Sequence, residues 1–108
     1  MALQVAALSI ELIETLCPLV PRIKARDKSL ADQLTRATTS VALNIAEAEG
    51  AAPGTRRARF FSAAGSANET LMAVKVAIAW RHLKSAEGEP AQALLRRIIA
   101  MLWKLTRG

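Results

Sequence analysis

The sequence predicts an all-α protein, and three observations support this fold class. Apolar residues make up 52% of the 108 residues, much of this alanine, whereas aromatic residues make up only 4%. Tyrosine is absent, and β-branched residues are scattered instead of alternating as they do in strands. Apolar residues recur at helical spacing along four segments separated by turn residues. A chain of this length forms one domain, residues 1–108, with a modest core.

The first expected helix covers residues 2–17 and carries two neighbouring apolar stripes. One stripe contains Leu3, Ala6, Ile10, Ile13 and Cys17, and the other contains Val5, Leu8, Leu12, Leu16 and Leu19. Together they are wider than the apolar face that one core-facing helix needs. Pro18 and Pro21 end or kink this helix. Residues 22–28 are expected to form a charged connector or a frayed helical turn.

The second expected helix covers residues 30–49 and has a signal at each end. Ser29 is predicted to cap its start, in an approximate capping box with Asp32. Gly50 is predicted to end it in the left-handed conformation. Asn44 falls on the apolar stripe of this helix and not on its polar face.

The third expected helix covers residues 56–84, with Thr55 as its N-cap, and the fourth covers residues 90–106. Pro90 suits the first turn of the fourth helix, because its missing N–H has no intrahelical partner there. Four helices joined by short loops predict an antiparallel up-and-down four-helix bundle. The wide apolar faces of the first and last helices predict a homo-oligomer.

Two polar pairs lie in apolar stretches of the second and third helices. Asn44 and Glu47, and then Ser66 and Glu69, are each three residues apart and therefore neighbours on a helix surface. Because a buried polar group needs a partner, we expect a network in which Ser66 donates to one of the glutamates and fixes helix register. Acid–base chemistry or a di-metal site is the alternative, but the single histidine, His82, lies far along the chain.

The net charge of +6 and a pI of about 10.5 favour polyanionic partners. Arg56, Arg57 and Arg59 lie in the first turn of the third helix, where the helix dipole disfavours cations but favours bound phosphate. We therefore predict a nucleic-acid-binding cluster here. The alternative is a solvated cluster whose arginines pair with Glu47, with Glu49 or with acids of a neighbouring subunit.

A second basic cluster, with Arg22 and Lys24, precedes the second helix. It is a candidate secondary nucleic-acid contact, although such a connector is more often only solvated. Lys104 and Arg107 lie near the end of the last helix, where cations are favourable in any case. We interpret these two as structural residues.

The remaining signals concern compartment and packing. A single cysteine, Cys17, forms no internal disulfide and fits a reducing compartment. The N-terminal segment carries Glu11 and Glu14 and lacks a basic region, so it does not read as a signal peptide, and we expect a cytoplasmic protein. Trp80 and Trp103 are expected in the core or in an interface, with base stacking as the alternative.

Several of these segments resemble one protein family. The runs S-V-A-L-N-I-A-E (40–47) and A-A-G-S-A-N-E (63–69) resemble the four-helix-bundle proteins encoded in bacterial 23S rRNA intervening sequences. The runs at 29–37 and 94–102 extend the resemblance over nearly the whole chain. It implies ring-shaped homopentamers of four-helix bundles. A related branch contains the accessory variability determinant of diversity-generating retroelements, a basic pentamer that binds nucleic acid and a reverse transcriptase.

The resemblance extends to individual residues, namely Asn44, Glu47, Gly65, Ser66 and Glu69, which match the motif positions of the family. Three positions depart from it.

At the three departures, Ala48 stands where the family usually has glycine, Glu49 where an aromatic often follows, and Ala64 where a basic or large residue often precedes Gly-Ser. These changes remove basic and aromatic surface, so they weaken the transfer of a nucleic-acid site more than the transfer of the fold.

The sequence lacks a nucleophile–base pair, a glycine-rich phosphate loop and metal-ligand spacing, so we expect no catalytic residues, no metal, no cofactor and no enzyme activity. The leading hypothesis is an oligomer that binds RNA or DNA with weak sequence preference, as an accessory or scaffold, with a reverse transcriptase as one candidate partner. The second is a protein-interaction scaffold whose charge is incidental. The third is a metal- or ligand-binding enzyme that uses Glu47 and Glu69. We expect no membrane partner.

Overall fold

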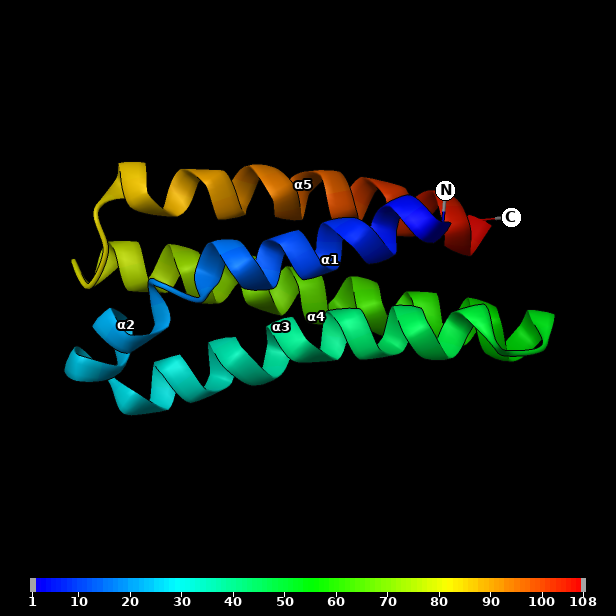
Figure 1. Ribbon diagram of the computed structural model, residues 1–108, viewed down its shortest axis with the longest axis horizontal. Coiled ribbons are helices and arrows are strands. Elements are labelled where there is room, and N and C mark those ends of the chain that lie inside the picture. The colour runs from blue at the N-terminus through cyan, green and yellow to red at the C-terminus, as the bar shows by residue number, and fades with distance from the viewer. Residues whose placement is uncertain (1, 108) are drawn as a thin grey trace.

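The computed structural model describes residues 2–107, and every regular element in that range is a helix. The elements are α1 (Ala2–Leu16), α2 (Val20–Arg26), α3 (Lys28–Glu49), α4 (Pro53–Ala79) and α5 (Ser85–Arg107). The four long helices lie side by side along the long axis of a molecule measuring 42 × 22 × 19 Å, and α2 lies at one end (Figure 1). The all-α prediction is therefore confirmed, with five helices where four were expected.

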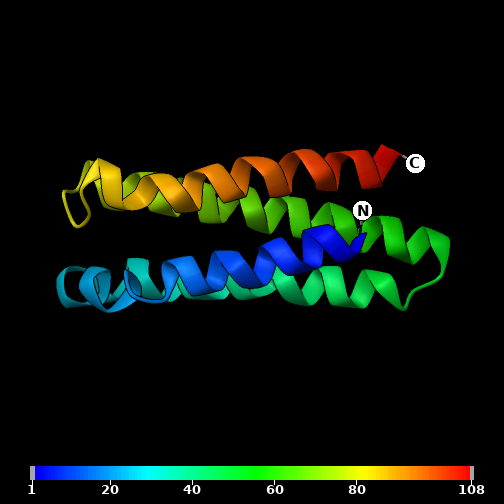
Figure 2. The same cartoon turned by 45° about the horizontal axis from the view of Figure 1, so that its top comes forward.

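Helix α1 buries only one of its two apolar stripes. Val5 and Leu12 are fully buried, whereas Leu3 and Ile10 of the other stripe are 80% and 53% exposed. α1 packs against α3 on one side and α5 on the other (Figure 2). The second stripe is thus the excess apolar surface that the sequence predicted.

The segment between the first two long helices is itself helical. Pro21 occupies the first turn of α2, where a proline costs no intrahelical hydrogen bond, and Ile23 is fully buried against the core. A frayed turn was one of the two expectations for residues 22–28, and the buried isoleucine explains why the turn is ordered.

Helix α3 begins at a different cap from the one predicted. Asp27 is the N-cap, and its Oδ1 accepts a hydrogen bond from the N–H of Leu30 at 3.0 Å. Ser29 lies inside the helix, so its predicted capping role is wrong. Gly50 follows the helix with φ −96° and ψ 4°, which corrects the predicted left-handed C-cap.

Helix α4 starts earlier and ends earlier than predicted. It begins at Pro53, which occupies the first helical position, so Thr55 lies inside the helix and is not its N-cap. It ends at Ala79, because Arg81 adopts a left-handed φ of 66°. The N–H of His82 donates to the carbonyl of Ala77 at 2.9 Å, which with the left-handed residue forms a Schellman motif.

Helix α5 also starts earlier than predicted, at Ser85 instead of residue 90, and Pro90 lies inside it. The side chain of Glu87 explains the early start: its Oε1 accepts a hydrogen bond from the N–H of Lys84, the residue before the helix, at 2.8 Å. Gly88 then lies against α4, where an added Cβ would be 2.7 Å from Cδ1 of Ile78. Only glycine allows the two helices to approach this closely without a shift.

The core lies between α3, α4 and α5, with α1 and α2 closing it. The most extensive contact joins α3 and α4, where small side chains predominate on the α4 side. Ala63, Ala64 and Ala67 are fully buried there, and Phe60 is the largest fully buried side chain. Gly65 faces away from this contact, since an added Cβ would meet no atom within 4 Å.

Within residues 2–107, no single helix is long and apolar enough to cross a membrane. Helices α1 and α2 together meet the length and composition criteria, but the chain bends by 50° between them.

Candidate nucleic-acid interface

A polar network joins α3 to α4 near the middle of both helices. Nδ2 of Asn44 donates to Oγ of Ser40 at 3.0 Å and to its carbonyl at 2.9 Å, and Oγ of Ser40 lies 2.8 Å from Oγ of Ser66. Asn44 and Ser66 are both half-buried. The network links the two helices as expected, but through Ser40, which the sequence analysis did not identify. Its position one turn before Asn44 was the available signal.

The two glutamates of the paired motifs lie outside this network. Glu47 is exposed, and its Oε2 lies 3.1 Å from Nε of Arg59. Both side chains of this ion pair are about half exposed, so it stabilises the fold little. Glu69 is exposed, and within residues 2–107 neither glutamate accepts a hydrogen bond from Ser66. The predicted serine–glutamate bond is therefore wrong.

Two of the three predicted arginines share a cavity with a lysine from another helix. Arg56 and Arg57 of α4, with Lys104 of α5, line a cavity of about 610 Å³ at the end of the molecule where α4 begins and α5 ends (Figure 1). The guanidinium of Arg56 lies 5.5 Å from the centre of the Phe60 ring, which helps to hold it in place. Across residues 2–107, the ion pairs include none of these three cations. Arg59, by contrast, faces α3.

The second predicted cluster is divided between two cavities. Arg22 lines one cavity with Arg26, Arg81 and His82, whereas Lys24 lines another with Asp32 and Arg36.

Arg22 is also paired with an acid. It donates to Oε2 of Glu87, and this hydrogen bond lowers the pKa of the Glu87 carboxyl and raises the pKa of the guanidinium. Arg22 is thus partly neutralised, and Arg22 and Lys24 do not form one site.

The histidine and the tryptophans have mixed environments. His82 lies with Nε2 3.9 Å from Oδ2 of Asp27, and its Nδ1 is buried without a hydrogen-bond partner within residues 2–107. Trp80 is 68% exposed, so it does not lie in the core of the subunit, and its interface position stays a prediction. Trp103 is half-buried and packs edge-on against Phe61, with the ring centres 5.2 Å apart. In the described part of the chain, no three His, Cys, Asp or Glu side chains cluster as metal ligands do.

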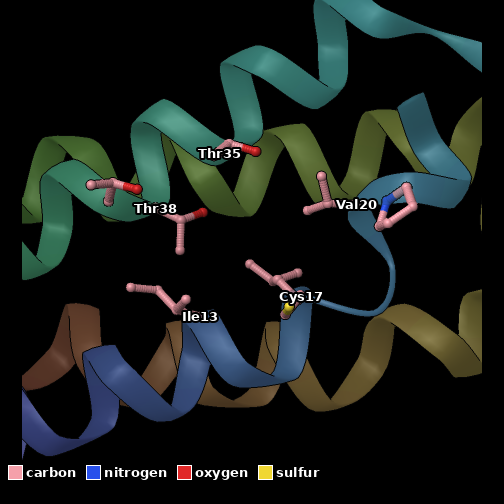
Figure 3. A pocket seen from close by; sticks show the side chains of 8 residues that line it. Ile13, Cys17, Val20, Thr35 and Thr38 are labelled. Atoms are coloured by element: carbon pink, nitrogen blue, oxygen red, sulfur yellow. The ribbon is translucent and has the colours of Figure 1, made fainter.

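An apolar groove lies between α1, α2 and α3 (Figure 3). Its volume is about 250 Å³. Ile13 and Cys17 line one side, Thr35 and Thr38 of α3 line the other, and Val20 of α2 lies at one end. Cys17 is exposed at this groove. The sequence signalled excess apolar surface on the first helix but not the groove, because α2 was not predicted as an element.

Comparisons with known proteins identify a family model that matches this chain and a solved structure with the same fold. The family model described as "23S rRNA-intervening sequence protein" matches residues 1–104. A crystal structure of a protein of unknown function from the S23 ribosomal protein family of Bacteroides thetaiotaomicron superposes with a TM-score of 0.88 at 22% identity. The alignment covers 96% of this chain and 99% of that one, which shows a shared fold. No curated protein matches the chain.

Proposed function

We propose, from the fact that this chain belongs to the 23S rRNA-intervening sequence protein family, that it is a non-enzymatic, oligomeric accessory protein that binds nucleic acid. Its partner is RNA or DNA, bound through phosphates with weak sequence preference. It acts in the cytoplasm as a scaffold for a nucleic-acid process, with a reverse transcriptase or another protein as a further partner.

The observation that carries this proposal is the cluster of Arg56, Arg57 and Lys104 around one cavity. Within residues 2–107 these cations have no ion-pair partner, and the chain carries a net charge of +6. Cations without partners keep their full charge for a ligand, and phosphate contacts of this kind supply most of non-specific nucleic-acid binding.

The other predicted contact residues have acidic neighbours and contribute less. Arg59 pairs with Glu47, and Arg22 pairs with Glu87. Lys24 shares its cavity with Asp32. Each of these cations gains less from a phosphate, because binding the phosphate competes with its own acid.

The proposed assembly is a ring-shaped homopentamer of antiparallel up-and-down four-helix subunits. The exposed stripe of α1 and the apolar groove beside it support an interface between copies, because monomers rarely leave such surface uncovered. In a ring the basic cavity repeats in every subunit. Several weak phosphate contacts then act on one strand together, which raises the overall affinity.

The test is a salt titration of binding to a labelled structured RNA and to a matched DNA duplex, on protein freed of nucleic acid. The logarithm of affinity should fall linearly with the logarithm of salt concentration. Arg56→Gln and Arg57→Gln should each reduce the magnitude of that slope by about 1. Arg97→Gln is the control, because Arg97 is exposed and forms no ion pair within residues 2–107.

Absence of RNA and DNA binding even at low salt would refute the proposal. Equal slopes for the cavity variants and the Arg97 control would retain nucleic-acid binding but refute this site.

The apolar groove supports a second candidate, a protein-interaction scaffold with incidental charge. Ile10 on α1 and Leu43 on α3, two of the three helices that border the groove, are 53% and 58% exposed. A partner protein that remains bound after nuclease treatment and that Ile13→Glu releases, with RNA binding absent, would favour this second function.

A further inference from the structure

The basic cavity differs from the other cation clusters in its composition. Its described lining consists of Arg56, Arg57 and Lys104, with an apolar remainder: Ala51, Pro53, Gly54 and Leu105. None of these lining residues is acidic. The cavities beside Arg22, Lys24 and Arg59 each include a carboxylate, from Glu87, Asp32 and Glu47 respectively.

The charge of this cavity matches a dianion better than a monoanion. Three side-chain cations face the same space. An internal phosphodiester brings one negative charge, whereas a phosphomonoester carries about −1.5 to −2 at neutral pH and offers three terminal oxygens. Two guanidiniums can donate paired hydrogen bonds to such a group, and the lysine adds a compact charge.

The volume and the apolar wall indicate more than a free ion. About 610 Å³ lies within the range of small-ligand sites, roughly 300–1,000 Å³, and far exceeds the volume of one phosphate. Pro53 and Leu105 provide apolar surface beside the cations, against which a sugar or a base can pack. The uncapped start of α4 adds partial positive charge, but the three side chains carry the argument.

The position of the cavity is suited to the end of a nucleic-acid strand. It lies between the first turn of one helix and the last turn of its neighbour, at one end of the elongated molecule (Figure 1). We propose that this cavity binds the terminal phosphomonoester of a nucleic-acid strand, with the terminal nucleotide packed against Pro53 and Leu105. The proposal rests on the nucleic-acid-binding function above and names the group that its three cations bind. Lys104, interpreted from the sequence as structural, is one of these cations.

The experiment compares short single-stranded RNAs of one sequence that carry a 5′-phosphate, a 3′-phosphate or no terminal phosphate. Fluorescence anisotropy at fixed salt measures the affinity of each. A terminal phosphate should tighten binding about tenfold through its charge-assisted hydrogen bonds. The two phosphorylated RNAs show which strand end is preferred, and a gain with either end supports the proposal.

Lys104→Gln should remove most of the gain from the terminal phosphate. The gain is measured as the ratio of the affinities for the phosphorylated and the unphosphorylated RNA, so a general loss of RNA affinity from the missing cation cancels. Lys75→Gln is the matched control, because Lys75 is exposed on α4 and lies 18 residues from Arg57, or about 27 Å along the helix axis.

The control therefore tests the loss of one exposed lysine from the same chain at a distance from the cavity. It should preserve the full gain from the terminal phosphate. Circular dichroism confirms that both variants keep the helical fold, as expected for two exposed side chains.

The outcomes separate this inference from the function on which it rests. Equal affinity of the wild-type protein for all three RNAs overturns the terminal-phosphate site and leaves nucleic-acid binding intact. Loss of the gain in both lysine variants also overturns it, because the effect then follows net charge and not the cavity.

If neither these RNAs nor the structured RNA and the DNA duplex bind, the proposed function fails, and the cavity is tested by itself. Nuclear magnetic resonance with uridine monophosphate and with uridine as probes should show shifts of the Gly54 and Leu105 amide signals for the phosphorylated compound only. The absence of such shifts overturns the site.

Discussion

The left-handed residue that ends α4 gives a prediction whose size follows from the backbone. Arg81 has a φ of 66°, a conformation that costs a non-glycine residue about 1–2 kcal/mol. Arg81→Gly removes this cost. It also raises the conformational entropy of the unfolded chain, which lowers the gain in unfolding free energy by about 0.4–1 kcal/mol. The net gain is about 0.5 kcal/mol, or roughly 2 °C in Tm for a domain of this size.

The matched substitution lies in the turn between α3 and α4, far from Arg81 along α4. Gly50 has φ −96°, and an added Cβ would meet no atom within 4 Å, so Gly50→Ala should also raise the Tm by about 2 °C. Because the two sites are far apart, the double variant should gain about 4 °C. Arg81→Ala is the control for the lost charge and should bring no gain, since alanine keeps the backbone strain.

Differential scanning calorimetry at one protein concentration measures all four variants. A fall in Tm for Gly50→Ala would show that Gly50 needs the left-handed conformation after all. Equal effects of glycine and alanine at position 81 would show that the charge, and not the backbone, decides.

Four further substitutions test the start of α3, the core and the surface ion pair. Asp27→Ala should cost about 1 kcal/mol of unfolding free energy in urea, whereas Ser29→Ala should be near neutral, because only the aspartate caps α3. Phe60→Ala should cost about 3–5 kcal/mol in the same assay, since the ring is fully buried. Arg22 lowers the pKa of Glu87, so their pair stabilises the fold above the ordinary carboxyl pKa of about 4.5 and loses this effect as the pH falls through the lowered value. Arg22→Gln should therefore lower the Tm near neutral pH but not in strong acid, in thermal melts across that range.

The long helices could be predicted because their apolar spacing is regular. Their ends could not, because one end depends on a residue without a sequence signal and two starts have competing signals nearby. Arg81 occupies a position where glycine is usual, so the sequence carried no signal for the end of α4. Pro53 and Asp27 did carry start signals, but Thr55 and Ser29 offered competing ones nearby.

The candidate site was predictable in part. Arg56 and Arg57 were identified from charge at a helix start, but Lys104 lies 47 positions later and joins them only through the packing of α4 against α5. The spacing of Asn44 and Ser66 indicated a link between helices, yet the direct partner of both is Ser40. Pairing across helices depends on their rotation and offset, which periodicity along one helix does not determine.

In the proposed oligomer, the uncovered stripe of α1 would make folding and assembly one equilibrium. A free subunit holds this helix by a single buried stripe, so α1 is the long helix expected to open first, and its amides should exchange fastest. Covering Leu3 and Ile10 in an oligomer would slow that exchange without any change inside the subunit. Dilution alone would then loosen the N-terminal helix while α3, α4 and α5 stay closed, so that protein concentration sets how much of the chain is folded.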